Sequence, residues 1–217
     1  MQSPSPTNQL TKVLLFGGTF DPVHNGHLEI ARFMANRLAV GRTIFIPAAQ
    51  PPHKNDVFYS PFQYRIRMLR LAIGNDNLFD VSDCELNRPG PSYTLDTVKH
   101  FRQQLHKHTK LYWLIGADTL AQLHTWHKPA QLIQLCTIVT ALRPSCPDYT
   151  TADLSVLKPV LNDQQIQQLR THIYPSPLIN ISSTNIRQRI RQGQTIDNLT
   201  PAPVVHFIKQ NKLYLQK

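Results

Sequence analysis

The sequence predicts an α/β fold in which a doubly wound, mostly parallel sheet is covered by helices on both faces. Short apolar runs alternate along the chain with segments whose apolar residues recur at helical spacing. The strongest runs, at 13–16 and 110–115, are almost wholly apolar, as expected for strands buried on both faces. At 217 residues, of which 41% are hydrophobic, the chain is long enough to bury a single core.

Six strands are expected, in the order in which the apolar runs occur. They are residues 13–16, 42–47, 79–81, 110–115, 136–142 and 178–181. Residues 84–86 are a candidate extension at the edge formed by the third strand. In sheets of this class, ligands bind beyond the carboxyl ends of the strands, where the strand order reverses. The loop after the first strand is therefore a candidate binding site.

Helices are expected between these strands, and capping residues indicate where two of them begin. Ser60 can cap a helix whose first position is Pro61, and Ser92 can cap the next helix. The expected helices are residues 28–38, 62–73, 92–107, 162–171, 184–192 and 203–210, with helical turns between 116 and 135.

One domain is expected at 12–217, after a disordered tail at 1–11 and with a variable segment at 145–174 that matches no motif. No signal peptide is expected, because the first residues lack a basic start and an apolar core. No apolar run approaches the roughly 18 residues of a transmembrane helix. The cysteines (Cys84, Cys136 and Cys146) show no Cys-x-x-Cys spacing, which favours a cytoplasmic location over a disulfide framework or a zinc site.

The net charge of +10, from 23 Lys and Arg against 13 Asp and Glu, favours anionic partners. Nucleic acid is one such class, and small phosphate compounds are another. The basic residues are dispersed, with no basic run interleaved with aromatics. Dispersed charge suits small phosphates at least as well as nucleic acid, so the charge alone leaves both classes open.

The segment after the first strand, GGTFDPVHNGH at 17–27, carries the strongest functional pattern. Gly17 and Gly18 let the backbone approach a ligand without a Cβ in the way. A helix beginning near Gly26 directs N–H groups and the positive end of its dipole toward the same place. His24 and His27 add two side-chain donors. Each part alone is ordinarily a turn or a cap, but together they favour a polyphosphate pocket.

A second pattern, ISSTNIR at 181–187, lies far along the chain. Its hydroxyls can cap a helix and donate to phosphate oxygens, and Arg187 offers a planar fork that suits phosphate. Alone, the pattern is more often a capped helix with a surface arginine. Together with the first pattern it predicts two helix N-termini that converge on one triphosphate.

Three further segments bear on a second substrate. PPHK at 51–54 ends in Lys54, which can reach a phosphate, and ELNRPGPSYTLDT at 85–97 combines a turn, a cap and polar groups. GAD at 116–118 ends in Asp118, beyond the fourth strand. Trp126 is either a core residue or a face for a flat heterocycle, where a positively charged ring would add a cation–π attraction of ~0.5–2 kcal/mol.

Taken together, these motifs resemble the bacterial nicotinate mononucleotide adenylyltransferase family, part of the nucleotidyltransferase superfamily, and the resemblance extends from Val13 to Tyr214. It implies a Rossmann-like nucleotidyltransferase fold. It also implies an enzyme of NAD biosynthesis that transfers AMP from ATP to nicotinate mononucleotide, giving deamido-NAD and pyrophosphate. The partners implied are ATP with Mg²⁺ and nicotinate mononucleotide, without nucleic acid or membrane. Monomer and homo-oligomer both stay open.

The resemblance further implies roles for individual residues. The ATP-binding residues would be Gly17, Gly18, Thr19, Phe20, His24, His27, Asp118, Ser183 and Arg187, and the catalytic residues among them His24, His27 and Arg187. The residues that would bind nicotinate mononucleotide are Lys54, Thr94, Asp118, Trp126 and His127. Trp126 would stack on the nicotinate ring, and Thr94 with the backbone N–H of His127 would receive its carboxylate.

The implied chemistry needs little acid–base catalysis. The acceptor phosphate is already an anion at pH 7, so its in-line attack on the α-phosphorus of ATP requires positioning and charge stabilisation, without a covalent intermediate. Three alternatives remain: adenylyl transfer to phosphopantetheine or to nicotinamide mononucleotide, a nucleic-acid-binding protein, and a nucleotide sensor without activity.

Overall fold

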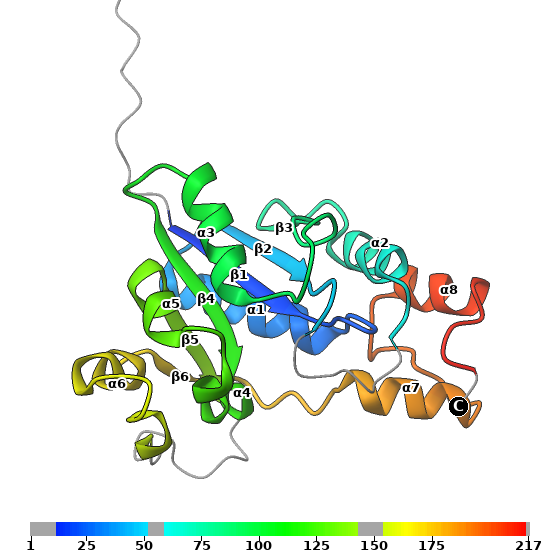
Figure 1. The fold of residues 1–217 in the computed structure, drawn as a ribbon. Coiled ribbons are helices and arrows are strands. Elements are labelled where there is room, and N and C mark those ends of the chain that lie inside the picture. The colour runs from blue at the N-terminus through cyan, green and yellow to red at the C-terminus, as the bar shows by residue number, and fades with distance from the viewer. Residues whose placement is uncertain (1–11, 52–58, 143–153, 216–217) are drawn as a thin grey trace, which may run out of the picture.

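A six-stranded parallel sheet forms the centre of the molecule (Figure 1). The computed structural model describes residues 12–51, 59–142 and 154–215. The strands are β1 (Lys12–Gly18), β2 (Arg42–Pro47), β3 (Phe79–Val81), β4 (Lys110–Gly116), β5 (Thr137–Leu142) and β6 (Ile173–Pro175). They lie in the order β3-β2-β1-β4-β5-β6, and all five pairings are parallel. The predicted fold class is confirmed.

The sheet opens between its two central strands. β1 and β4 pair only as far as Leu15 and Trp113, although each strand continues for three more residues. Over those residues β1 stays paired with β2, and β4 stays paired with β5. This is also the position at which the strand order reverses, where sheets of this class bind ligands.

Helices cover both faces of the sheet (Figure 1). One face packs against α1 (Asn25–Leu38), α2 (Phe62–Ile73), α7 (Ser183–Arg191) and α8 (Ala202–Gln210). The other packs against α3 (Thr94–Gln104), α4 (Ala117–Ala121), α5 (Pro129–Leu135) and α6 (Asp163–Arg170). Successive strand residues point to opposite faces, so Leu14 and Leu15, both fully buried, belong to different core clusters. Two 3₁₀ turns, η1 (Leu123–Thr125) and η2 (Ser155–Leu157), complete the second face.

The last strand was predicted in the wrong place. It is β6, which pairs with β5 through Ile173, whereas residues 178–181 form an extended connection to α7. Leu178 is 68% exposed, and Ile179 and Ile181 line a pocket instead of joining the sheet. The apolar run therefore serves as a pocket wall.

Two predicted caps and one strand extension also differ. The cap position of α2 is Pro61, and Ser60 instead donates its N–H to Asp21. α3 begins at Thr94, while the Ser92 hydroxyl accepts the N–H of Gln50 at 3.0 Å. Residues 84–86 form a turn. At both predicted caps, a polar group of the serine bonds to a neighbouring loop instead.

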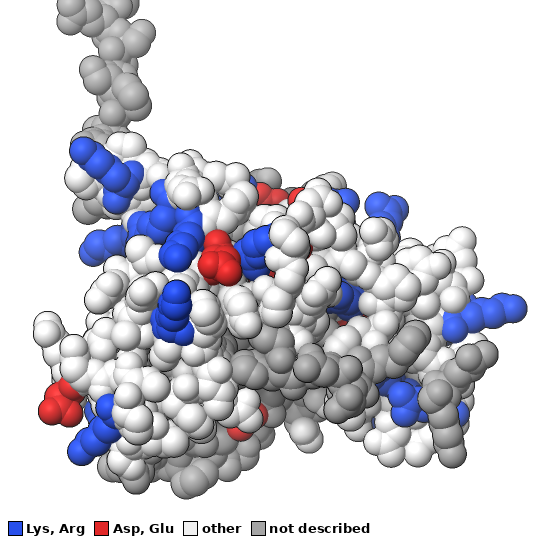
Figure 2. Space-filling model, viewed as in Figure 1, with Lys and Arg blue, Asp and Glu red and all other residues white. Residues whose placement is uncertain are grey.

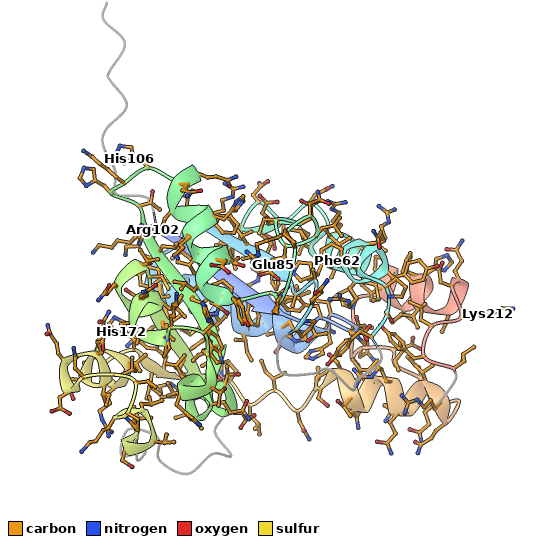
Figure 3. All side chains as sticks on the ribbon, viewed as in Figure 1. Phe62, Glu85, Arg102, His106, His172 and Lys212 are labelled. Atoms are coloured by element: carbon orange, nitrogen blue, oxygen red, sulfur yellow. The ribbon has the colours of Figure 1, made fainter. Side chains whose placement is uncertain are left out.

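The basic side chains are spread over the surface, with one concentration over α3 (Figure 2). Arg102 and His106 lie toward the far end of that helix, well away from the buried Glu85 (Figure 3).

Among the described residues, no helix is long and apolar enough to span a membrane. Cys84 and Cys136 are free thiols, and burial raises the pKa of Cys136 to about 12, so it is protonated at neutral pH. Cys146, the 1–11 tail and the part of the 145–174 segment before 154 lie outside the described residues.

Candidate active site

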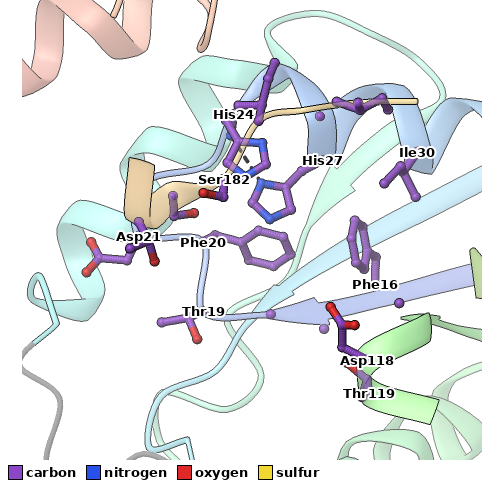
Figure 4. Close-up of a pocket in the computed structure, with 18 of the residues that line it drawn as sticks. Phe16, Thr19, Phe20, Asp21, His24, His27, Ile30, Asp118, Thr119 and Ser182 are labelled. Carbon is purple, nitrogen blue, oxygen red and sulfur yellow. Dashed lines mark hydrogen bonds between the residues drawn. The ribbon is translucent and has the colours of Figure 1, made fainter. Parts of the chain in front are cut away.

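A pocket of about 530 Å³ lies at the opening between β1 and β4 (Figure 4). Its walls come from the β1–α1 loop, the start of α1, the start of α4 and the start of α7. All nine predicted ATP-binding residues line it: Gly17, Gly18, Thr19, Phe20, His24, His27, Asp118, Ser183 and Arg187. The two sequence patterns thus converge on one cavity, which we call the larger pocket.

The two histidines form a single stacked unit in this pocket. The centroids of their rings are 3.6 Å apart with an interplanar angle of 27°. His24 is the cap residue of α1, and its backbone N–H donates to Nδ1 of His27 at 3.3 Å. The Phe20 ring lies edge-on to His27 at a centroid distance of 5.0 Å. The imidazoles are therefore held by packing on both sides, which lowers the cost of orienting them for a ligand.

Not every N–H group of the first turn of α1 is directed at the pocket. The N–H of Asn25 donates to the carbonyl of Leu199 at 2.9 Å, and its side-chain amide donates to Asn198. The expected contribution of this helix N-terminus is correspondingly smaller, because one of its free donors is already used.

The glycines make room for the protein's own side chains. A Cβ on Gly17 would overlap with the indole of Trp113, and one on Gly18 would lie 2.9 Å from Cζ of Phe20. A Cβ on Gly26 would lie 2.8 Å from Ile179. The expected close approach of backbone to ligand is thus accompanied by a close approach of backbone to pocket walls.

The start of α7 is tied to the β1–α1 loop. Ser182 caps the helix by accepting the N–H of Asn185, and the Ser183 hydroxyl donates to the carbonyl of Pro22 at 2.8 Å. Arg187 donates to the carbonyl of Asp21 at 2.7 Å. The predicted phosphate-binding residues of the second pattern therefore also fix the first pattern in place.

A second pocket of about 300 Å³ adjoins the first. The two share wall residues from the open ends of β1 and β4, including Phe16, Gly17 and Ile115. Three predicted acceptor-binding residues line it: Thr94, Trp126 and His127. We call it the smaller pocket.

The smaller pocket is walled by rings. Tyr93 and His127 stack with centroids 4.5 Å apart at 22°. Trp126 is half-buried, packs against the core cluster and also lines the smaller pocket, so its use as a ligand face stays a prediction. Of the other predicted acceptor contacts, Asp118 lines the larger pocket, and Lys54 lies outside the described residues.

A buried ionic chain, which sequence reasoning missed, supports the smaller pocket. Glu85 is 4% exposed and accepts hydrogen bonds from the Thr97 hydroxyl at 2.5 Å and from the N–H of Ala49 at 3.4 Å. Arg88 lies 3.5 Å from Glu85 and donates to Thr97 and to the carbonyl of Tyr93. Tyr93 directly precedes Thr94, so this chain fixes the start of α3.

A second missed cluster adjoins the larger pocket, which Asp21 itself lines. Asp21 and Arg65 are each 2% exposed. Arg65 donates to the carbonyls of Thr19, Ala48 and Ser60 at 2.8–3.0 Å, joining three loops. Burial lowers the pKa of the Arg65 guanidinium, and the nearby Asp21 carboxylate opposes that shift. A lone arginine in an amphipathic helix gives no signal in the sequence, although Asp21 stands within the first pattern.

Comparison with known proteins assigns the family. Residues 15–189 match the cytidylyltransferase-like family model. A protein of Dehalococcoides mccartyi named "probable nicotinate-nucleotide adenylyltransferase" is 38% identical over 95% of this chain and 98% of its own length. A protein of Neisseria meningitidis with the same name is 38% identical over 94% and 99%. The chain belongs to the nicotinate-nucleotide adenylyltransferase family.

Solved structures support the fold of this family member independently. The nicotinic acid mononucleotide adenylyltransferase of Plasmodium falciparum in complex with NaAD superposes with a TM-score of 0.71 at 17% identity, covering 94% of this chain and 97% of that one. The same enzyme in complex with APC gives a TM-score of 0.70 at 16% identity, over the same shares of the two chains.

Proposed function

We propose that this protein is a nicotinate-nucleotide adenylyltransferase, which transfers AMP from ATP to nicotinate mononucleotide and releases deamido-NAD and pyrophosphate. The observation that carries the proposal is the opening of the sheet between β1 and β4, which puts two pockets side by side. One has the donors for a triphosphate and the other has rings and a hydroxyl for a flat heterocycle. A bond between two nucleotides would form at their shared wall.

The larger pocket suits in-line transfer. ATP would lie along Gly17–Gly18, with its phosphates facing His24, His27, Ser183 and Arg187. Negative charge develops on the phosphoryl oxygens during transfer, and fixed imidazole and guanidinium donors stabilise it without reorganising. The acceptor phosphate is an anion at neutral pH, so no residue has to remove its proton.

The metal in this proposal is Mg²⁺. Among the described residues, no three His, Cys, Asp or Glu side chains gather in a way that could hold a metal ion. Mg²⁺ prefers phosphate oxygens and water, with one or two carboxylates, so it would arrive with ATP. Asp118 is the candidate carboxylate, because it lines the larger pocket, whereas the carboxylate of Asp21, which lines it too, already accepts hydrogen bonds from Ser60 and Tyr214. When bound, the ion neutralises triphosphate charge.

The smaller pocket favours the acid acceptor over the other candidates. Trp126 would stack on the positively charged ring, and Thr94 and the N–H of His127 would donate to its carboxylate. Phosphopantetheine has no ring to use these walls. A cytoplasmic location, suggested by the cysteine usage, and the absence of nucleic-acid and membrane partners are part of the same proposal.

The test is a comparison of acceptors. The purified protein is incubated with ATP, Mg²⁺ and nicotinate mononucleotide, nicotinamide mononucleotide or phosphopantetheine, and pyrophosphate release is measured. Deamido-NAD, identified by mass, is the expected product. Adenylylation of phosphopantetheine with nicotinate mononucleotide left unused would show the proposal to be wrong. Retention on DNA at high salt without any turnover would favour the nucleic-acid-binding alternative.

A further inference from the structure

Asp21 lines the larger pocket, and its carboxylate points away from the two imidazoles (Figure 4). Its Oδ2 accepts the N–H of Ser60 at 3.1 Å, and its Oδ1 accepts the hydroxyl of Tyr214 at 2.5 Å. The backbone carbonyl of the same residue accepts Arg187. Asp21 therefore connects a side chain near the end of the chain to a guanidinium that lines the pocket.

The backbone of Tyr214 has an unusual conformation at the point where its hydroxyl reaches this carboxylate. Its φ is +65°, a left-handed conformation that L side chains rarely adopt, and Lys212 nearby has φ +51°. Such conformations are energetically unfavourable and persist only where the surrounding structure holds them. The hydroxyl comes from 193 positions further along the sequence than Asp21, so the contact has no local origin.

We propose that Tyr214 is a positioning residue for the larger pocket, acting through Asp21 on Arg187. With its carboxylate held by Tyr214 and Ser60, Asp21 presents its carbonyl in a fixed direction, and that carbonyl holds one N–H group of Arg187. Arg187 also donates to Thr184 at 3.3 Å. The remaining N–H groups of Arg187 are then directed at the phosphates of ATP, which is how this inference rests on the proposed function.

The Tyr214 hydroxyl is the donor in its contact with Asp21. The Asp21 carboxylate raises the pKa of both Arg65 and Tyr214, whereas the Arg187 guanidinium lowers the pKa of Tyr214. Burial and the Asp21 carboxylate raise the pKa of Tyr214, so its hydroxyl stays protonated and remains a donor at all ordinary pH values.

The first experiment replaces Tyr214 with phenylalanine, which removes the hydroxyl and keeps the ring. We expect kcat/KM for ATP to fall severalfold, by no more than the effect of Arg187→Lys, because the hydroxyl acts only through Arg187, while KM for nicotinate mononucleotide stays unchanged. Tyr64→Phe is the matched control, because Tyr64 lies in α2 against Phe207 and lines neither pocket. Wild-type kinetics in Tyr214→Phe, with or without a lower Tm, would overturn the inference.

A second measurement separates the inference from the proposed function. ATP affinity is measured by calorimetry without an acceptor, in the wild type, Tyr214→Phe, Arg187→Lys and the double variant. If Tyr214 acts through Arg187, the double variant binds ATP about as weakly as Arg187→Lys alone. Additive losses would overturn the proposed path. A wild type that binds ATP but forms no deamido-NAD would refute the function, while the cycle would still decide the role of Tyr214.

Discussion

The two pockets are built in different ways. In the larger pocket, the polar side chains are held by the backbone of the β1–α1 loop: His27 by the N–H of His24, and Arg187 by the carbonyl of Asp21. In the smaller pocket, the walls are rings, and Thr94 opens a helix supported by buried Glu85. In the proposed function, the first arrangement would fix charges for a reaction, and the second would select a shape and a pattern of donors. Substitutions in the two pockets should therefore act on different kinetic constants.

The largest effect is expected in the larger pocket. Replacing His24 or His27 with alanine should lower kcat about 10²–10³-fold, because a fixed donor to developing charge is lost, and should weaken ATP binding much less. Single-turnover rates and ATP affinity measured on the same preparations check this. His108→Ala, at an exposed position after α3, is the control. Near-normal turnover in both variants would reduce the pair to helix-capping residues.

A smaller effect, on choice of acceptor, is expected in the smaller pocket. In the proposed function, the nicotinate carboxylate would accept hydrogen bonds from Thr94 and a backbone N–H, whereas an amide would turn its own NH₂ toward one of these donors. An unsatisfied buried polar group costs ~1–3 kcal/mol, so kcat/KM should favour the acid roughly tenfold to 150-fold.

Two substitutions test the origin of this preference. Thr94→Val should reduce the preference for the acid by lowering kcat/KM for nicotinate mononucleotide. Thr94→Ser, which keeps the hydroxyl, should retain most of the preference. Trp126→Ala should lower kcat/KM for both acceptors, since both carry the flat cationic ring. The measurement is kcat/KM for each acceptor at saturating ATP. Equal use of both acceptors by the wild type would exclude this description of the pocket.

The same contrast explains what could be predicted from sequence. The larger pocket was located because its residues follow strands, and parallel strands bring their carboxyl ends to one edge. Arg65 and Tyr214 could not be found, because each is one polar residue in an ordinary helix or chain end whose partners are distant. The run at 178–181 predicts a strand because apolar side chains that line a pocket and those buried in a sheet look alike in sequence. The role of Lys54 in binding nicotinate mononucleotide stays a prediction, because this residue lies outside the described residues.

The smallest effect expected in this comparison comes from a substitution that keeps the charge. Arg187→Lys retains a cation in the larger pocket but cannot hold the carbonyl of Asp21 and present a fork to phosphate at the same time. KM for ATP should rise severalfold, by roughly the worth of one hydrogen bond, while KM for nicotinate mononucleotide stays the same, because Arg187 does not line the smaller pocket. Arg191→Lys, at the exposed end of the same helix, is the matched control. If the KM for ATP did not change, Arg187 would serve only to hold the loop, and phosphate binding would have to come from the histidines and the start of α7.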